Sequence, residues 1–297
     1  RLNEFLHSME LYSSFSEEQN MKWEAQVRFF RAFIYFQLTK RHPKGVILYT
    51  SLDQMSKDKA RSSNEETWNL IESDLNFAIE NLPEKWSSSD KGRVSKYAAL
   101  AFKSRAMLYA ERWQSAYDAA NEVINSGIYG LMDNYEEAWK GNNKESILEF
   151  DYDISGPNHT FDKDYVPLCD GYEFGGLGTP TQEMVESYEK TDGTKMDWTP
   201  YHSAQTVRPP YESLEPRFKA TVIYPGSIWK GNVMQNSVNG IYGTFMAYRT
   251  QPFIYGHTTT GYYLRKLLDE SLLDVNGVPS TQPWVEIRYA EVLLNKA

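Results

Sequence analysis

The sequence is almost free of cysteine, with Cys169 as the single example among 297 residues. One thiol cannot form a disulfide within the chain, and a structural zinc site needs several cysteine or histidine ligands at close spacing. Asp170 follows the cysteine, and an adjacent acid disfavours the thiolate form that reactive cysteines require. The sequence thus argues against disulfide scaffolds and zinc-stabilised folds, and Cys169 is interpreted as a structural residue.

Long apolar runs and an excess of basic residues are also missing. No stretch approaches the roughly 20 apolar residues that a membrane-spanning helix needs. Lys and Arg total 31 against 40 Asp and Glu, and the resulting net charge of −9 argues against nucleic acid, because phosphate binding needs a basic face. No signal peptide is recognisable at Arg1, which says nothing about export if the chain continues upstream.

Catalytic motifs are not recognisable either. The histidines at 7, 42, 159, 202 and 257 are not paired at metal-helix spacing, and neither a Gly-x-Ser-x-Gly elbow nor a phosphate loop occurs. Asp162/Asp164 and Glu183/Glu186 are close in sequence, but a glycosidase needs two carboxylates about 5–10 Å apart across a cleft. These pairs are interpreted as solvated acidic faces. The residues therefore give no indication of an enzyme.

Helical periodicity dominates the first half of the chain. Residues 22–40 predict a long helix that packs on more than one side. Its apolar stripe is formed by Trp23, Val27, Phe30, Ile34 and Leu38 and is widened by Ala25, Phe29, Ala32 and Phe36. Further helices are predicted over residues 65–82, about 95–112 and 113–125. Residues 96–127 have the length of a tetratricopeptide hairpin, with alanines where the two helices meet. The predicted fold is mainly α, with tetratricopeptide-like helical hairpins as a scaffold.

The composition changes after residue 146. Residues 147–280 are rich in Gly, Pro, Thr, Asn and Tyr, which predicts a long irregular region with short strands that binds ligand. Residues 1–146 form the predicted helical repeat region, and residues 281–297 the start of a further repeat, all within one integrated domain. The last fourteen residues, from Trp284, predict a helix whose face is formed by Ile287, Ala290, Leu294 and Ala297. This helix has no closing signal, so we expect a longer protein and a face that is partly bare or covered by earlier helices.

Aromatic residues in the irregular region are the candidates for ligand binding. Sugar rings have apolar C–H faces that stack on aromatic rings, while their hydroxyls need polar partners nearby. The predicted ligand residues are Trp198, Trp229, Tyr201, Tyr172, Asp197 and Asn232. The alternative is that these rings only anchor their loops. The tryptophans within predicted helices, Trp23, Trp68, Trp113 and Trp284, are interpreted as packing residues.

One weak cation motif occurs at the start of the irregular region. Asp151, Asp153 and Ser155, followed by Gly156, match the front half of a calcium loop. The twelfth position is Asp162, shorter than the usual bidentate Glu. A plain turn is the favoured alternative, and no other cofactor is predicted.

Several segments in a fixed order resemble the SusD/RagB family, the nutrient-binding outer-membrane lipoproteins of Bacteroidota. The matching segments are residues 24–36 (E-A-x-x-x-F-x-R-A-F-x-Y-F), 92–131 (ending S-G-x-Y-x-L), 145–150 (E-x-I-x-E), 180–188, 192–193, 215–218, 261–266 (G-Y-x-x-R-K) and 284–295 (W-x-x-x-R-Y-A-E-V-L-L-N). Glu215 stands where the family usually has Asp, and the turn after Gly45 lacks the usual Pro. The resemblance covers residue 22 to the end.

This resemblance implies a protein that binds an oligosaccharide or polysaccharide without cleaving it and passes it to a TonB-dependent, SusC-like outer-membrane transporter. It also implies a cell-surface location through a lipid anchor; the lipidated cysteine is expected upstream of Arg1 and cannot be Cys169. The last helices of the family are expected downstream of Ala297. Two alternatives from other classes are a tetratricopeptide-type adaptor that binds peptides and an all-helical carbohydrate-active enzyme.

Overall fold

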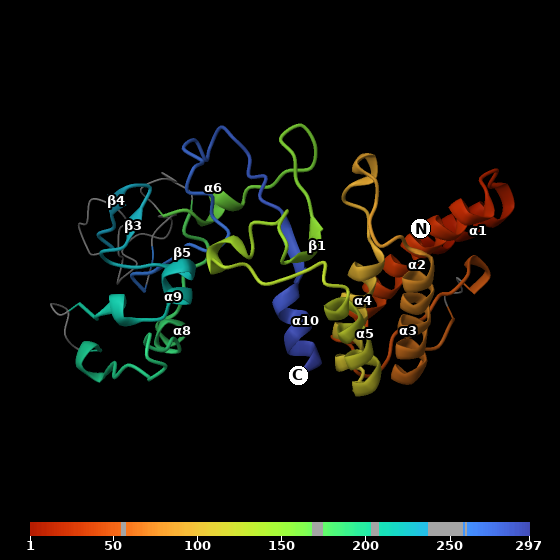
Figure 1. The fold of residues 1–297 in the computed structure, drawn as a ribbon, viewed down its shortest axis with the longest axis horizontal. Helices are drawn as coiled ribbons and strands as arrows, with labels where there is room; N and C mark the ends of the chain where they lie inside the picture. Colours follow the sequence, from red (N-terminus) through yellow and green to blue (C-terminus); the bar gives the residue numbers. More distant parts are fainter. Residues whose placement is uncertain (55–57, 168–174, 203–207, 237–257, 259) are drawn as a thin grey trace. The chain divides into compact units, whose positions relative to one another are not determined.

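The computed structural model describes residues 1–297 except 55–57, 168–174, 203–207, 237–257 and 259 (Figure 1). The chain divides into two compact units. The helical unit comprises residues 1–132, 141–150 and 285–297, and the loop-rich unit comprises residues 133–140 and 151–284. Neither the predicted domain boundaries nor the predicted single integrated domain is tested by this division, and both stay predictions.

The helical unit consists of α1 (Leu2–Tyr12), α2 (Glu17–Thr39), α3 (Asn64–Asn81), α4 (Lys96–Tyr109), α5 (Trp113–Asn125) and α10 (Tyr289–Lys296), with the short 3-10 turns η1 (Leu52–Gln54) and η2 (Ser88–Asp90). Consecutive helices from α1 to α5 pack side by side, and α10 packs on both α4 and α5 (Figure 1). The predicted mainly helical fold and the α4–α5 hairpin are confirmed.

Local sequence signals account for where these helices begin and how closely they approach. Ser63 caps α3 in a reciprocal capping box with Glu66, and Ser95 caps α4 through the Ala98 N–H. Alanine side chains at the α4–α5 contact are fully or almost fully buried, which allows the two backbones to lie close together. The buried alanines are Ala98, Ala99, Ala101, Ala106, Ala116, Ala119 and Ala120.

The buried face of α2 differs from the predicted stripe. Phe29, Ala32 and Phe36 are at most 1% exposed, whereas Phe30 and Ile34 are 46% and 49% exposed. The helix turns Phe29 and Phe36 toward Phe102 of α4, with ring centroids 5.5 and 5.2 Å away. Both faces of α2 are apolar in sequence, so periodicity alone did not identify the one that packs in the helical unit.

The last segment begins as a strand, not as the predicted helix. β6 (Trp284–Arg288) pairs with β1 (Ser146–Phe150), and α10 starts only at Tyr289. Ile287 is therefore buried from a strand, and Val292 is the buried residue of α10, while Leu294 is 76% exposed. A helix across residues 284–297 was wrong because its first five residues have a β partner more than a hundred residues upstream.

Charges beside the apolar faces of the helices form ion pairs. Arg31 of α2 makes two 2.7 Å bonds to Asp74 of α3, and both side chains are buried. Arg105 of α4 binds the Glu291 carboxylate at 2.5 and 2.6 Å, donates to the backbone oxygen of Glu286 at 2.6 Å and pairs with the Glu286 side chain. These bonds fix the final segment to the hairpin.

Over its described residues, the loop-rich unit contains only short elements. These are the turn η3 (Tyr135–Glu137), α6 (Phe161–Tyr165), α8 (Gln182–Glu186), η4 (Thr199–Tyr201), η5 (Tyr211–Ser213), α9 (Pro216–Thr221), β2 (Val222–Ile223), β3 (Ile228–Trp229), β4 (Asn232–Val233) and β5 (Tyr263–Leu264). β2 pairs with β5 and β3 pairs with β4, both antiparallel. The predicted irregular region with short strands is confirmed.

Candidate functional site

Trp198 lies inside an aromatic cluster. The ring is 5% exposed and packs with Tyr211, Phe218 and Tyr262, among others. Its indole Nε1 is buried and meets no acceptor among the described residues. Burial raises the pKa of the Tyr211 hydroxyl, which also shares a 2.9 Å hydrogen bond with Tyr262. The Trp198 ring thus contacts protein on its faces, which favours the anchoring alternative for this residue.

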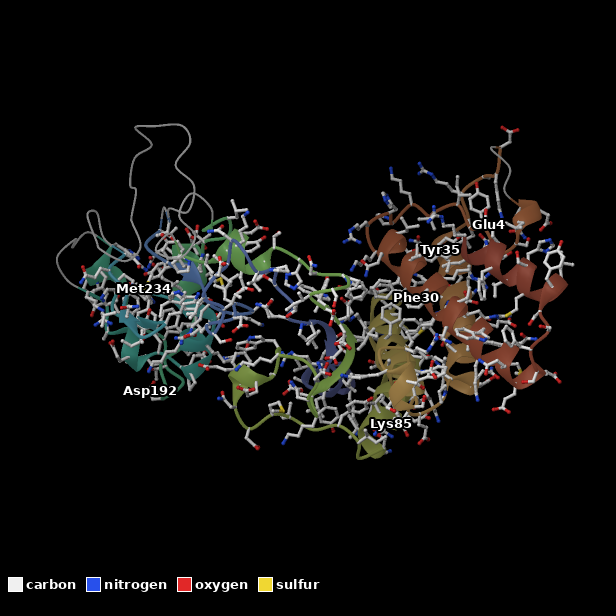
Figure 2. All side chains as sticks on the ribbon, turned by 90° about the horizontal axis from the view of Figure 1, so that it is seen from above. Glu4, Phe30, Tyr35, Lys85, Asp192 and Met234 are labelled. Carbon is white, nitrogen blue, oxygen red and sulfur yellow. The ribbon has the colours of Figure 1, made fainter. Side chains whose placement is uncertain are left out.

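Trp229 lies in β3 and is 1% exposed. It belongs to a second apolar cluster that includes Val166, Met234 and Tyr263 (Figure 2 labels Met234). Its register partner Asn232 in β4 is exposed and donates its amide to the Lys230 oxygen at 3.2 Å. The ring is positioned by the hairpin to fill the core, while the amide faces solvent.

Of the remaining predicted ligand residues, two lie close to Trp198 in the chain and one lies outside the described residues. Tyr201 is half-buried beside Trp198, with ring centroids 6.3 Å apart. The side chain and backbone of Thr199 donate to Asp197, which lowers the pKa of that carboxyl. Tyr172 lies outside the described residues. Trp198 and Trp229 belong to different clusters, so the structure does not bring the predicted set together at one place.

The candidate calcium segment forms a hydrogen-bonded turn. Asp153 Oδ1 accepts from the Ser155 N–H and hydroxyl, both at 2.8 Å, and the Gly156 N–H donates to the Asp153 backbone oxygen. These hydrogen bonds lower the pKa of Asp153. Within the described ranges, no three His, Cys, Asp or Glu side chains are grouped to hold a metal ion. This geometry is that of a plain turn, the alternative to a calcium loop that the sequence favoured for Asp151, Asp153 and Ser155.

A hollow of about 250 Å3 in the loop-rich unit is lined by aromatic side chains that the sequence did not single out as a group. The rings form a series: Tyr152 and His159 lie 4.4 Å apart between centroids, and Phe161 and Tyr165 stack at 4.5 Å with planes 29° apart. Trp284, predicted to be a packing residue, also lines the hollow and is 52% exposed. The packing prediction was wrong for Trp284 and also for Trp113, which is 62% exposed. Trp284 begins β6 and Trp113 begins α5, and at the end of an element fewer neighbours of the same element cover a side chain.

Hydrogen bonds hold this aromatic wall in place. The Phe161 N–H donates to His159 Nδ1 at 3.2 Å, so Nε2 carries the proton and donates to the Gln282 oxygen at 3.0 Å. Phe161 and Tyr165 are one helical turn apart on α6, which places their rings on one face. A Cβ at Gly178 would come within 2.8 Å of the Tyr165 ring, so glycine is needed for the ring to lie there.

The short helix α6 also carries a buried carboxylate. Asp162 is fully buried and accepts from the Asp269 N–H at 2.7 Å and the Gln282 amide at 2.6 Å. Its interpretation as a solvated acid was wrong because these donors replace water. Its neighbour Asp164 lines the hollow and accepts from the Thr160 hydroxyl at 2.6 Å.

A second hollow of about 550 Å3 adjoins the first in the same unit. The two share Leu267, Gln282 and Pro283 as a common wall. The second hollow has a polar rim that includes Glu136, Lys140, Arg265, Asp269 and Glu270 around the Trp139 ring. Together they combine ring faces at one end with hydrogen-bonding groups at the other, the usual composition of a small-molecule site.

None of the described helices combines the length and the apolar character that crossing a membrane would need. The fold and these hollows define a class of protein that combines a unit of helical hairpins with a loop-rich unit containing aromatic-lined hollows. Residues 144–297 match the family model described as SusD family, and residues 1–108 match a model described as starch-binding associating with outer membrane. The chain belongs to the SusD family, which confirms the resemblance found in its motifs.

Individual relatives support this assignment. A SusD-like protein of Bacteroides ovatus is 28% identical over 233 residues, which cover 73% of this chain and 39% of that protein. Crystal structures of two Bacteroides fragilis proteins each cover 99% of this chain. The first, a SusD-like protein, has a TM-score of 0.83 at 28% identity, and the second, a SusD-like carbohydrate binding protein, 0.82 at 25%. The chain spans 60% and 57% of these two structures and about two-fifths of the curated relative.

Proposed function

We propose that this chain is part of a cell-surface glycan-binding protein that captures oligosaccharides and does not cleave them. The observation that carries the proposal is the match along 99% of this chain to a solved SusD-like carbohydrate binding protein, at 25% identity. The aromatic-lined hollows of the loop-rich unit offer the ring faces and hydrogen-bonding groups that sugars require.

The proposal extends to location and partner. The family model that matches residues 1–108 is described as associating with outer membrane, which supports an outer-membrane, surface-exposed location. Attachment through a lipid anchor outside this chain, and delivery of the glycan to a SusC-like TonB-dependent transporter, are parts of the proposal. Co-purification of the full-length protein with the transporter from native membranes would support delivery, and purification without any such barrel would contradict it.

The ligand residues predicted from sequence remain a proposal, which now favours the accessible members of the set over the two buried tryptophans. Asp197, Tyr201 and Asn232 offer groups at least partly accessible to a ligand, whereas Trp198 and Trp229 are buried. Alanine substitution of Tyr201 and Asn232 should reduce glycan affinity if this part of the surface binds. Unchanged affinity in both variants would remove it from the candidate sites.

Electrophoresis of the full-length protein through gels that contain single polysaccharides tests the binding function. Retarded migration in at least one gel, without release of reducing ends on incubation, is the expected result. Released reducing ends would indicate an all-helical carbohydrate-active enzyme. Migration unaffected by every polysaccharide, together with affinity for peptides, would indicate a tetratricopeptide-type adaptor.

A further inference from the structure

The aromatic hollow has the features of a built binding surface. Tyr152, Phe161 and Tyr165 are half-buried and Trp284 is half-exposed, so each ring is held by protein yet keeps surface accessible to a ligand. A ring buried like Trp229 cannot stack on a ligand without unfolding its surroundings, whereas these rings need no rearrangement. Preorganised aromatic surface binds at a low cost in side-chain entropy.

The charge around these rings favours one kind of ligand. Asp164 lines the hollow, and the buried Asp162 carboxylate accepts a hydrogen bond from the amide of Gln282, another lining residue, while the described lining contains neither Lys nor Arg. Both nitrogens of His159 are already engaged, one by the Phe161 N–H and the other by the Gln282 oxygen. A carboxylated or sulfated sugar would meet negative charge here without a cationic partner, whereas hydroxyl groups can donate to the Asp164 carboxylate.

The neighbouring hollow extends the surface. Glu136, Asp269 and Glu270 supply acceptors there. The two cations of its lining are paired with carboxylates, Lys140 with Glu137 at 2.7 Å and Arg265 with Glu270 at 2.6 Å. The shared wall at Leu267 and Pro283 is apolar, and on this wall Gln282 has an amide oxygen that no donor reaches in the described part of the chain. The two volumes of about 250 and 550 Å3 together fall within the range of roughly 300–1,000 Å3 typical of ligand sites.

We propose that the surface formed by Tyr152, Phe161, Tyr165 and Trp284, with Asp164 and Gln282, is a binding site for neutral oligosaccharides, and that it excludes acidic ones. The proposal rests on the proposed glycan-binding function and adds its location and ligand class. Sugar rings stack on Trp284 and on the Phe161/Tyr165 pair, and hydroxyls bind the carboxylate of Asp164. The second hollow accommodates the rest of the chain of sugars.

The test compares neutral and acidic polysaccharides with matched variants of the full-length protein. The probes are xyloglucan, laminarin and starch on one side and alginate and polygalacturonate on the other, with affinities measured by calorimetry on their oligosaccharides. Trp284→Ala and Tyr165→Ala should each weaken binding of the neutral ligand about tenfold, equivalent to about 1.4 kcal/mol for the loss of one stacking contact.

Trp113→Ala is the matched control, because Trp113 is a 62% exposed tryptophan on α5, in the helical unit. It should leave affinity unchanged. If the unchanged protein binds a neutral glycan and the Trp284 and Tyr165 variants bind it equally well, the site is wrong and the binding function stands. Binding confined to acidic glycans would overturn the ligand class. Binding to none of the glycans would overturn the function and, with it, the site.

Discussion

The buried ion pair between Arg31 and Asp74 gives a prediction about stability that can be worked out from its contacts. Asp74 has a side chain that is 1% exposed and accepts two 2.7 Å bonds from Arg31, which is 8% exposed. Arg31 also donates to Asn3 Oδ1 at 3.0 Å and to the Thr50 oxygen at 3.1 Å. Asp74→Ala would remove the bonded counter-charge and leave the guanidinium buried with its neutral partners, the weaker attraction of Glu24 and the repulsion of Arg28 nearby.

The guanidinium cannot escape this cost by losing its proton. Burial works against its charged form, but the hydrogen bonds and attraction of Asp74 outweigh burial and raise the pKa of Arg31. Without Asp74 the group stays protonated, because free arginine already has a pKa above about 12. Breaking one side of a buried pair costs about 3–5 kcal/mol, which corresponds to a fall in melting temperature of roughly 6–20 °C for a domain of this size.

Thermal unfolding followed by far-ultraviolet circular dichroism measures this effect. The matched control is Glu18→Gln, which breaks the exposed Lys22 pair on the same helix and should leave the melting temperature unchanged. The double variant Arg31→Met/Asp74→Leu should recover most of the loss, since an apolar pair needs no counter-charge. A loss below about 1 kcal/mol for Asp74→Ala, or a double variant as unstable as the single one, would refute the reasoning.

Three further predictions concern the loop-rich unit. Trp198→Ala and Trp229→Ala should each lower the free energy of unfolding by about 3–5 kcal/mol, because they open cavities in buried clusters. Trp284→Ala should leave the melting temperature nearly unchanged. An equal response of all three variants would contradict the burial of Trp198 and Trp229. Burial raises the pKa of Tyr211, so this residue contributes stability that is complete below the unfolded tyrosine pKa of about 10 and is lost as the pH rises above that value. Titration of the phenolate absorbance in the ultraviolet should show that Tyr211 ionises later than the other tyrosines. Tyr211→Phe should abolish that late component. Gly178→Ala should displace the Tyr165 ring and weaken neutral-glycan binding in calorimetry without removing any aromatic group, and unchanged affinity would show that the ring position is not needed.

Features set by neighbours in sequence could be predicted, and those set by distant partners could not. Ser63 and Ser95 predict the starts of α3 and α4, because an N-cap hydrogen bond involves only the next three residues. Trp198 stands in the polar sequence Met-Asp-Trp-Thr-Pro, which suggested exposure, but its packing partners Tyr211 and Tyr262 come from later segments. A loop residue's burial depends on those long-range contacts, which a local pattern does not contain.

The aromatic hollow illustrates the same limit from the other side. Its rings come from residues 152–165 and from Trp284, which lie more than a hundred residues apart. Within the first segment, the i, i+4 spacing of Phe161 and Tyr165 was a usable signal for a stacked pair. The contribution of Trp284 depends on its place in β6, and only the pairing with β1 establishes that strand.

The pairing of β1 with β6 also determines the order in which the protein can be completed during synthesis. The ribosome makes α2 to α5 first, then most of the loop-rich unit, and only afterwards β6 and α10. At about 5–20 residues per second, residues 126–283 occupy roughly 8–30 s of translation. Throughout that interval the surfaces of α4 and α5 that pack against α10 are without that helix, and Arg105 is without Glu286 and Glu291. Within residues 1–297, the helical unit therefore begins to fold first and can be completed only after residues 151–284 of the loop-rich unit have been made.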